Sequence, residues 1–423
     1  MIIRRSLSYG LCVVFGIFYF GLAVAAAALR PNIVIVIADD LGYGDTSTYG
    51  GKIATPNLQG MADAGTRFTS FYATPSCSPT RASLMTGLYS QRLGIDYPLT
   101  LKDKIGIPTA RVSLGELLQS AGYRTALIGK WHLGEPREFW PNRNGFHFFY
   151  GHHWGQADHL THKRYDGTID WWKNTTLLPM SENTALSVTR EAIAFIERNK
   201  SGRFFLVVSY LEPHYPYQAP GDPAGFSNPI RYPAMVTAVD NGLGQIIERL
   251  KKLGLNDNTL IIFFSDNGGV IAKGAAPIAS NDPLRGAKGY VWEGGIRVPA
   301  VFKWPGNIPH RVSNDILDVK DIFPTIAAIA GAKLPQYKLD GVNVLSALKG
   351  QGSAPKRKLF FEYGKRQAVR DGEWKLVIED DIVRLFNIEH DIGEKIDVSA
   401  ANPAKVAELK AAKDAWKNNM SQP

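Results

Sequence analysis

Five short stretches of the chain are continuously apolar and rich in Val, Ile and Phe, without the polar alternation of a half-exposed strand. They are Asn32–Ala38, Thr125–Ile128, Phe204–Tyr210, Leu260–Phe264 and Val298–Phe302. Runs of this length and composition are typical of strands that are buried on both faces of a mostly parallel sheet. We therefore expect these segments to form one large sheet.

Segments with the apolar spacing of helices lie between these expected strands. They are the segment with Leu114, Leu117 and Leu118, the stretch Ala185–Asn199, and the stretch Met235–Leu253, and each ends close to a glycine. Strands that alternate with helices predict an α/β fold in which helices cover both faces of the sheet. The sequence thus predicts a three-layer sandwich.

The pattern changes after about Leu334. Four short strand candidates and one amphipathic helix follow, at Leu359–Tyr363, Gln367–Arg370, Trp374–Ile378, Val383–Asn387 and Pro403–Asn418. The strand candidates are separated by Gly, Asp and Lys, which favours a small antiparallel sheet with a terminal helix. We therefore expect a large α/β domain over residues 29–334 and a small α+β subdomain over residues 335–423.

The first residues, 1–28, read as a secretory signal. Arg4 and Arg5 make a basic start, the stretch Leu11–Val24 is apolar, and Ala25–Ala28 supplies small residues for cleavage. The apolar run is short for a membrane span and no basic residues follow it, which favours removal over anchoring. We expect an exported protein, periplasmic or secreted, without a stable membrane anchor.

Composition narrows the picture little further. Hydrophobic residues make up 45% and charged residues 21% of the chain, as in ordinary globular proteins. The formal net charge is +9, but the chain has no long Lys/Arg run and no nucleic-acid motif. We expect no nucleic-acid partner, and the charge alone does not select one kind of anionic partner over another.

Cys77 is the only cysteine that remains after removal of the signal. Exported proteins normally pair their cysteines in disulfides, so a solitary one is either an inert thiol or a chemically used group. Its neighbours favour chemistry. Pro79 suits the first turn of a helix, whose N-terminus favours negative charge, and Arg81 lies one turn further along.

Polar motifs follow four of the expected strands. They are Asp39-Asp40, Lys130-Trp131-His132, His214 and Asp266-Asn267. Ligands of open parallel sheets bind at the carboxyl ends of the strands, where all four motifs fall. We therefore expect one site at this edge of the sheet.

Three carboxylates at such a site require a cation. A pair of acids about 4 Å apart repels by roughly 4 kcal/mol at an effective dielectric constant of 20. Asp39, Asp40, Asp266 and the Asn267 amide offer only oxygen ligands, which favours calcium or magnesium over zinc. His132 and His214 titrate near neutrality and are candidates for proton transfer.

The segment Cys77–Arg81, followed by Ala82–Gly87, resembles the signature of the type I sulfatases of the alkaline phosphatase superfamily. The resemblance extends from about Pro31 to the C-terminus and includes further motifs, Gly129–Gly134, Glu212–Pro216, Ser265–Gly268 and Gly286–Arg297. It implies a sulfuric ester hydrolase. In that family the cysteine is oxidised after translation to formylglycine (3-oxoalanine), which requires a maturation enzyme as partner, and the hydrated aldehyde is the nucleophile.

The resemblance also assigns the metal site. It implies that Asp39, Asp40, Asp266 and Asn267 hold calcium, with magnesium the second choice. The formylglycine oxygen at position 77 would complete the shell.

The remaining assignments concern the sulfate group. The resemblance implies that Arg81 and Lys130 stabilise the formylglycine hydrate and its bound sulfate, and that Lys288 contacts a sulfate oxygen near the leaving group. His214 with Lys288 would assist departure of the alcohol. His132 would then take the proton whose loss expels sulfate.

A further group of histidines crowds one Gly- and Trp-containing stretch: His147, His152, His153, His159 and His162. Their spacing fits no standard metal site, so a substrate-contacting loop is the favoured interpretation over a second metal. Sulfatases that the chain resembles usually carry an acid where His147 stands, which suggests that this residue tunes the leaving-group pocket or a loop contact. Trp154, Trp171 and Trp172 either stack on sugar rings or pack in the core.

The favoured substrate class is a sulfated carbohydrate, with small aryl sulfates also accepted. One alternative is a phosphonate or phosphate ester hydrolase of the same superfamily. The other is a catalytically silent glycan-binding homologue, although every catalytic position is filled. The sequence leaves open the sugar, the sulfated position, endo or exo action, the oligomeric state and whether Cys77 is modified.

Overall fold

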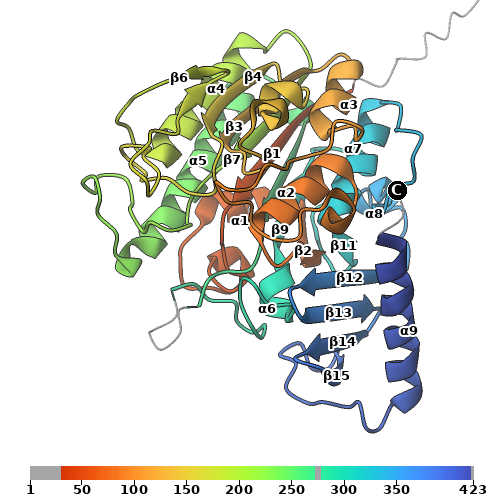
Figure 1. Cartoon of the computed structure of the whole chain (residues 1–423). Coiled ribbons are helices and arrows are strands. Elements are labelled where there is room, and N and C mark those ends of the chain that lie inside the picture. Colours follow the sequence, from red (N-terminus) through yellow and green to blue (C-terminus); the bar gives the residue numbers. More distant parts are fainter. Residues whose placement is uncertain (1–29, 272–277, 421–423) are drawn as a thin grey trace, which may run out of the picture.

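The computed structural model of the chain describes residues 30–271 and 278–420 (Figure 1), so the expected signal at residues 1–28 lies outside the described residues. Within them the main sheet has 11 strands, and its order is β10-β2-β9-β8-β1-β7-β3-β4-β5-β6, with β11 beside β2. In chain order the strands are β1 (Asn32–Ala38), β2 (Thr66–Tyr72), β3 (Arg124–Lys130), β4 (Phe148–His152), β5 (Trp172–Lys173), β6 (Thr176–Leu177), β7 (Phe204–Ser209), β8 (Thr259–Ser265), β9 (Arg297–Lys303), β10 (Arg311–Ser313) and β11 (Leu317–Asp318).

The five apolar stretches of the sequence form the centre of this sheet, as β9, β8, β1, β7 and β3. Strands β8, β1, β7, β3 and β4 are parallel, which confirms the mostly parallel sheet. Strand β9 differs, because it runs antiparallel to both β8 and β2. Burial on both faces makes a strand apolar whatever its direction, so the pattern could not reveal this.

Helices cover both faces of the main sheet (Figure 1). The α-helices of this part are α1 (Pro56–Asp63), α2 (Cys77–Thr86), α3 (Leu114–Ser120), α4 (Thr184–Arg198), α5 (Tyr232–Lys252), α6 (Glu293–Ile296), α7 (Ile322–Ala330) and α8 (Leu345–Leu348). Short 3₁₀ turns occur at Ser47–Tyr49, Ser90–Leu93, Arg137–Phe139, Pro141–Arg143, Pro229–Arg231, Asn256–Asn258 and Val319–Asp321. The expected α3, α4 and α5 are confirmed.

Alternate residues of each central strand belong to different cores. In β1, Ile33 and Ile35 pack into the core that contains α2, α3 and α7, whereas Val34 and Val36 pack into the core that contains α1, α4 and α5. Successive side chains of a strand point to opposite faces, so a strand between two helical layers must be apolar at every position. Each such side chain contributes about 1.5–3 kcal/mol when fully buried.

The C-terminal residues form a four-stranded antiparallel sheet with the order β12-β13-β14-β15, as expected. Its elements are β12 (Lys358–Tyr363), β13 (Arg366–Asp371), β14 (Trp374–Glu379), β15 (Ile382–Asn387) and the helix α9 (Pro403–Met420), which lies along one face of the sheet (Figure 1). Trp416 of α9 stacks on Phe360, with ring centroids 5.3 Å apart. The other face packs against Tyr72 and Trp292 of the main part. The domain boundary at residue 334 stays a prediction.

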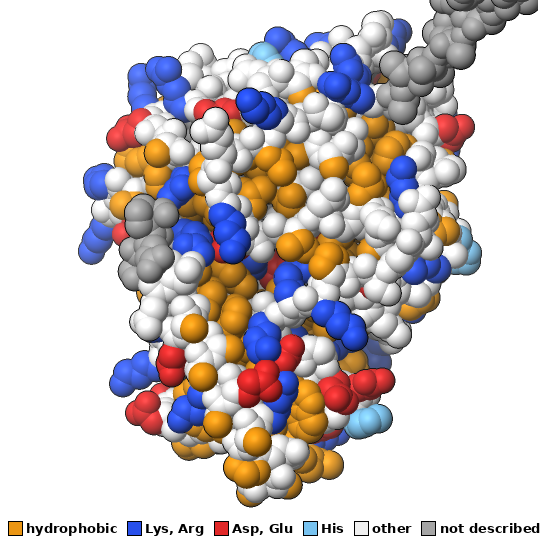
Figure 2. All heavy atoms as spheres, turned by 90° about the vertical axis from the view of Figure 1, so that its right-hand side faces the viewer, with side chains coloured by type: hydrophobic (Ala, Val, Ile, Leu, Met, Phe, Trp, Pro, Cys, Tyr) orange, Lys and Arg blue, Asp and Glu red, His pale blue; other side chains and the backbone are white. Residues whose placement is uncertain are grey.

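The surface adds two observations. Figure 2 shows Lys and Arg side chains scattered over one face, with acidic side chains gathered mostly on its lower part, where the small sheet and α9 lie. The positive charge on this face is therefore not gathered into one stripe. Within the described residues, none of the helices has both the length and the hydropathy needed to cross a bilayer.

Candidate active site

Cys77 is the first residue of α2, and its side chain is buried. Ser76 precedes the helix in an extended conformation, and Pro79 lies in the first turn, where a missing N–H breaks no helical bond. The Cys77 Sγ lies 3.3 Å from Nδ1 of His132. Burial raises the pKa of the Cys77 thiol, so the unmodified side chain is neutral. The helix start and the histidine together present residue 77 to the carboxyl edge of the sheet.

The tautomer of His132 follows from its second contact. Its Nε2 lies 2.8 Å from the carbonyl oxygen of Leu99, and a carbonyl only accepts, so Nε2 carries the proton. Nδ1 of the neutral ring then has a free lone pair directed at Cys77. Burial and the charge of Lys130 lower the pKa of His132 well below its usual value. The ring is therefore a base oriented toward residue 77.

Arg81 is buried one turn along α2 and donates hydrogen bonds to three other residues of the site. Its Nε and Nη2 donate to Asp266 Oδ2 at 3.1 and 2.8 Å, and Nη1 donates to Ser209 Oγ at 2.6 Å and to the Lys130 carbonyl at 3.1 Å. The sequence predicts that Arg81 lies near residue 77. The structure adds that its hydrogen bonds go to Asp266, Ser209 and Lys130.

The acidic residues converge where β1 ends. Asp40 has a φ of 66°, in the left-handed region, and this turn lets its carboxylate approach the same space as that of Asp39. Lys130 Nζ bonds to Asp39 Oδ2. Asp40 Oδ1 accepts from Lys288 Nζ at 2.6 Å and from Asn267 Nδ2 at 2.8 Å. Ion pairs therefore join the acids to the predicted lysines.

The acids differ in their protonation. Burial alone would raise the pKa of Asp39, but the charges of Lys130, Arg81 and Lys288 hold it well below the usual value. Burial and the negative charge of Asp39 raise the pKa of Asp266 instead. A divalent cation between the two groups would favour the ionised form of both.

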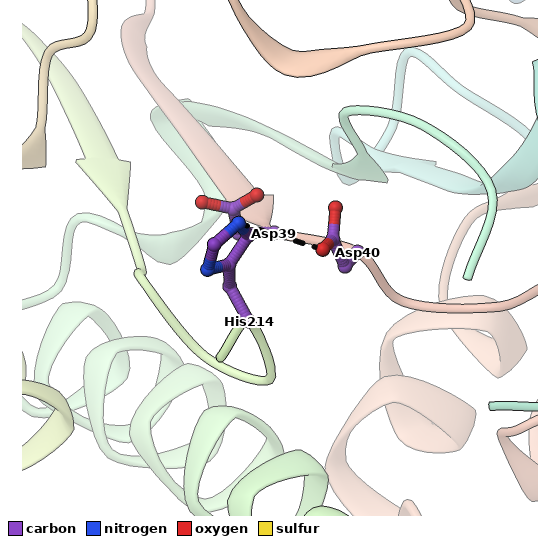
Figure 3. Close-up of side chains that lie close together, drawn as sticks. All are labelled: Asp39, Asp40 and His214. Atoms are coloured by element: carbon purple, nitrogen blue, oxygen red, sulfur yellow. Dashed lines mark ion pairs between the residues drawn. The ribbon is translucent and has the colours of Figure 1, made fainter. Parts of the chain in front are cut away.

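His214 lies beside these acids. Figure 3 shows its ring directed toward Asp39 and Asp40, with Nε2 3.6 Å from Asp40 Oδ2. Nδ1 donates to the Tyr215 carbonyl at 2.6 Å, which leaves the Nε2 lone pair facing the carboxylates. Burial, and then Lys288, lower the pKa of His214 to about 4. The sequence predicts a role for His214 in proton transfer, and the structure also places its ring against Asp39 and Asp40.

Three side chains lie close enough together to hold a divalent cation, and Asp266, a predicted ligand, is not one of them. Potential ligand atoms of Asp39, Asp40 and His214 lie within 4.8 Å of one another, the one such group of three or more in the described part of the chain. Asp39 Oδ1 and Asn267 Oδ1 are buried and have no hydrogen-bond partner among the described residues. A buried polar atom left without a partner costs about 1–3 kcal/mol, which coordination would remove.

His159 and Glu212 form a buried pair behind His214 that the sequence did not predict. His159 Nδ1 lies 2.9 Å from Glu212 Oε1, and its Nε2 lies 3.3 Å from the His214 carbonyl. The backbone carbonyl of Glu212 accepts from the Asp39 N–H at 3.0 Å. Glu212 thus links the end of β1 to the loop of His214. In the sequence, the one sign of this role is that Glu212 lies two residues before His214.

The interpretation that His147 tunes the leaving-group pocket was wrong, and the alternative of a loop contact stays a prediction. Nδ1 of its ring lies 2.7 Å from Thr125 Oγ1, and Nε2 lies 3.1 Å from the Gln119 amide. Thr125 is near the start of β3, whereas Lys130 ends that strand about 16 Å away at a strand rise of about 3.3 Å per residue. His147 therefore lies at the opposite edge of the sheet and cannot tune the leaving-group pocket.

The other four histidines of that stretch are buried, so packing accounts for their side chains, and a substrate contact by the stretch stays a prediction. His152 ends β4, and His162 stacks on Trp171 with ring centroids 4.0 Å apart. His153 stacks on Trp140 at 4.2 Å. Trp171 is fully buried, so packing is the correct interpretation for it. Within the described residues these histidines form no group that could hold a metal.

Comparison with known proteins gives one consistent result. The model of the Sulfatase family matches residues 31–332. Arylsulfatase A of Bos taurus is 36% identical over 382 residues, which span 83% of this chain and 75% of that protein. N-acetylgalactosamine-6-sulfatase of Canis lupus familiaris is 34% identical over 381 residues, 84% of this chain and 73% of that protein.

Solved structures agree. The crystal structure of Ps i-CgsB in complex with k-i-k-neocarrahexaose has a TM-score of 0.86 and 34% sequence identity to this chain. The match covers 93% of this chain and 94% of that one, so it includes the small C-terminal sheet as well as the main sheet.

Proposed function

The chain belongs to the sulfatase family and is a sulfatase, and from that premise we propose that it removes sulfate from a sulfated carbohydrate by means of a formylglycine made from Cys77. The observation that carries this proposal is the 3.3 Å contact between Cys77 Sγ and the unprotonated Nδ1 of His132. An inert buried thiol would need no base directed at it. This one contacts His132 and lies within electrostatic reach of two lysines and two acids, Lys130, Lys288, Asp39 and Asp266.

The hydrate of an aldehyde at position 77 would supply one hydroxyl that attacks sulfur and a second hydroxyl whose loss of a proton expels sulfate and restores the aldehyde, which a thiol or a serine cannot do. His132 would accept the proton from the group at position 77 through Nδ1. The Leu99 carbonyl holds the opposite nitrogen, so the ring keeps both its tautomer and its orientation. Ser78 supports the same loop, since its hydroxyl donates to the His132 carbonyl at 2.9 Å and accepts from the Leu99 N–H at 3.0 Å.

The proposed metal is one calcium ion, held by Asp39, Asp40, Asp266 and Asn267 together with the oxygen of residue 77. When bound it would neutralise the acids and polarise a sulfate oxygen. Magnesium is the second choice. Both ions prefer oxygen ligands, and all of the proposed ligand atoms are oxygen. The two buried oxygens without partners, on Asp39 and Asn267, support this assignment.

The cations around the acids would stabilise negative charge on the sulfate. Arg81 and Lys130 are buried, and their positions are fixed by Asp266 and Asp39. The Lys288 side chain is 19% exposed and reaches the site from its open side. Burial alone would lower the pKa of Lys288, but Asp40 raises it far above the usual value, so the ammonium stays charged. Preplaced charges of this kind stabilise a transition state without reorganisation.

Departure of the alcohol is assigned to Lys288 and His214. Neutral His214 has a free Nε2, and the negative charge of a bound sulfate ester would raise its pKa and favour its protonation. Lys288 remains charged throughout and can stabilise the leaving oxygen directly.

Carbohydrate is the proposed substrate class for two reasons. One relative is named for a sulfated amino sugar, and the similar solved structure holds a neocarrahexaose. We further propose export to the periplasm or medium, as the predicted signal at residues 1–28 implies, and modification of Cys77 by a maturation enzyme.

The test compares substrates on protein produced together with a formylglycine-generating enzyme. We expect hydrolysis of nitrophenyl sulfate and of at least one member of a panel of defined sulfated oligosaccharides. The Cys77→Ala variant should hydrolyse neither. A preference of orders of magnitude for a nitrophenyl phosphonate ester would instead identify a phosphonate ester hydrolase. Absence of all hydrolysis by fully modified protein would favour a silent glycan-binding homologue.

A further inference from the structure

Two tyrosines from distant parts of the chain meet beside the candidate active site. Tyr97 belongs to the loop after α2, and Tyr363 is the last residue of β12 in the small sheet. Their ring centroids are 5.2 Å apart and their planes are inclined by 63°. Gly364 continues the contact, because a Cβ at that position would lie 3.5 Å from the Tyr97 hydroxyl oxygen. The turn between β12 and β13 therefore rests against Tyr97.

Tyr97 is joined to the catalytic group through its own loop. Leu99, two residues further along, accepts the Nε2–H of His132 at 2.8 Å and donates its own N–H to Ser78 at 3.0 Å. The position of Tyr97 is thus tied to residues that orient the base facing Cys77.

Tyr363 is joined to the lysine that we assign to the leaving group. A Cβ on Gly289, the residue after Lys288, would lie 3.6 Å from a ring carbon of Tyr363. Arg366, at the other end of the same turn, donates to the Gly289 carbonyl at 3.2 Å. Burial raises the pKa of Tyr363, and the next influences are the charges of Cys77 and Lys288. The phenol therefore lies within electrostatic reach of both.

The proposed mechanism gives no role to the phenol hydroxyl groups of Tyr97 and Tyr363. Tyr97 is well exposed, with 51% of the residue accessible to solvent, and Tyr363 is half-buried. Neither hydroxyl makes a hydrogen bond to another residue in the described part of the chain. Packing accounts for part of Tyr363, which lies against the core beneath the small sheet, and this contact fixes its ring. It does not account for two accessible phenols beside a catalytic lysine.

We propose that Tyr97 and Tyr363 form a binding site for a pyranose ring of the substrate, on the side of Lys288. This inference rests on the proposed function, because it requires a carbohydrate substrate. A sugar offers a C–H face to an aromatic ring and hydroxyl groups to a phenol, and two fixed tyrosines provide both. The small C-terminal sheet then contributes to substrate selection as well as to stability, through the turn after β12.

The experiment measures kcat/KM for an oligosaccharide and for nitrophenyl sulfate on the same fully modified protein. The oligosaccharide probes are neocarrahexaose and an oligosaccharide that ends in N-acetylgalactosamine-6-sulfate. In Tyr97→Ala and Tyr363→Ala, the ratio of oligosaccharide to nitrophenyl sulfate kcat/KM should fall about tenfold or more, a loss expected for one aromatic contact. Tyr97→Phe separates the ring from the hydroxyl, and its ratio should fall less.

Tyr165→Ala is the matched control. Tyr165 is 72% exposed and contacts Trp154, with ring centroids 5.0 Å apart, so it is an accessible aromatic outside the Tyr97–Tyr363 pair. Its ratio should equal that of the wild type. Thermal unfolding of each variant shows whether Tyr363→Ala has lost structure. If it has, the result for Tyr97→Ala, at an exposed position, decides the test alone.

The outcomes separate this inference from the function on which it rests. Hydrolysis of an oligosaccharide by the wild type with an unchanged ratio in the two alanine variants overturns the sugar site and leaves the proposed function standing. An equal fall in Tyr165→Ala also overturns it, because the loss would not be specific to the pair. A wild type that hydrolyses nitrophenyl sulfate but no oligosaccharide overturns the carbohydrate assignment and the site together.

Discussion

Nδ1 of His132 faces the Sγ of Cys77 at 3.3 Å, while the Leu99 carbonyl holds the opposite nitrogen of the ring at 2.8 Å. His132 and Cys77 come from different parts of the chain, the loop after β3 and the start of α2. His132 has a φ of 57°, and this left-handed conformation accompanies the turn that brings its ring over residue 77. The geometry makes several outcomes testable.

Substitution of His132 should act on turnover. We expect His132→Ala to lower kcat for nitrophenyl sulfate by about 10²–10⁴-fold, the usual contribution of a general base. The aldehyde content at position 77, measured in the same sample, controls for incomplete maturation. An equal loss in a protein with little aldehyde would assign the defect to maturation, and an unchanged kcat at full modification would refute the role as base.

The pH dependence should reflect histidines that stay neutral. Burial, and then Lys288, lower the pKa of His214 to about 4, and burial and Lys130 lower that of His132 well below the usual value. A group with a lowered histidine pKa loses its proton at lower pH, so the His214 ring is neutral above about pH 5, and the His132 ring stays neutral well below the usual histidine pKa. The kcat/KM for nitrophenyl sulfate should therefore hold steady between about pH 7 and pH 5 and fall below that range. A decline centred near about 6.5, the ordinary value for histidine, would contradict this environment.

Removal of calcium should cost both activity and stability. Protein dialysed against a chelator should lose turnover and melt at a lower temperature, and added calcium should restore both, because an ion that binds only the native state stabilises it by about 2.7 kcal/mol at 100 times its Kd. Asp266→Asn should weaken calcium binding measured by calorimetry. Asp318→Asn, at a buried acid paired with Lys320 elsewhere, is the control. Active protein that contains no metal on elemental analysis would oppose the assignment.

Lys375 should be important for stability. It is buried on β14, and its Nζ lies 2.9 Å from Glu293 Oε1 and 2.8 Å from Glu394 Oε1, both also buried. Lys375→Met would leave buried Glu394 without its cation and Glu293 with Arg297 as its remaining ion-pair partner, and we expect a loss of about 3–5 kcal/mol in the free energy of unfolding by urea. Lys405→Met removes a partly exposed lysine from Asp371 and should cost less than about 1 kcal/mol. Equal losses in the two variants would mean that the buried ion pairs of Lys375 contribute no more to stability than the partly exposed ion pair of Lys405.

The sequence predicted the centre of the fold well, for a physical reason. Strands such as β1 and β7 must be apolar at every position because helices cover both of their faces, and such runs are easily recognised. The short edge strands β5 and β6 have two residues each and carry no comparable pattern. The direction of β9 depends on the connection that precedes it, which hydrophobicity does not record.

The site was predictable where its residues lie at strand ends. Asp39, Lys130 and Asp266 lie at this edge because the strands before them end there. The supporting contacts were not predictable. Ser209 is an ordinary strand residue in the sequence, and the role of Leu99 depends on its backbone carbonyl, which any residue carries. The leaving-group-pocket interpretation of His147 failed for the same reason, because local composition did not show which edge of the sheet this histidine occupies.

The most direct test measures two quantities on the same samples, the fraction of residue 77 present as aldehyde and the turnover number with nitrophenyl sulfate. Mass spectrometry of the peptide that contains residue 77 gives the first, over a series of preparations made with increasing amounts of maturation enzyme. We predict that turnover rises in proportion to the aldehyde fraction and extrapolates to zero when that fraction is zero. Full turnover by protein in which residue 77 is entirely a thiol would contradict the account.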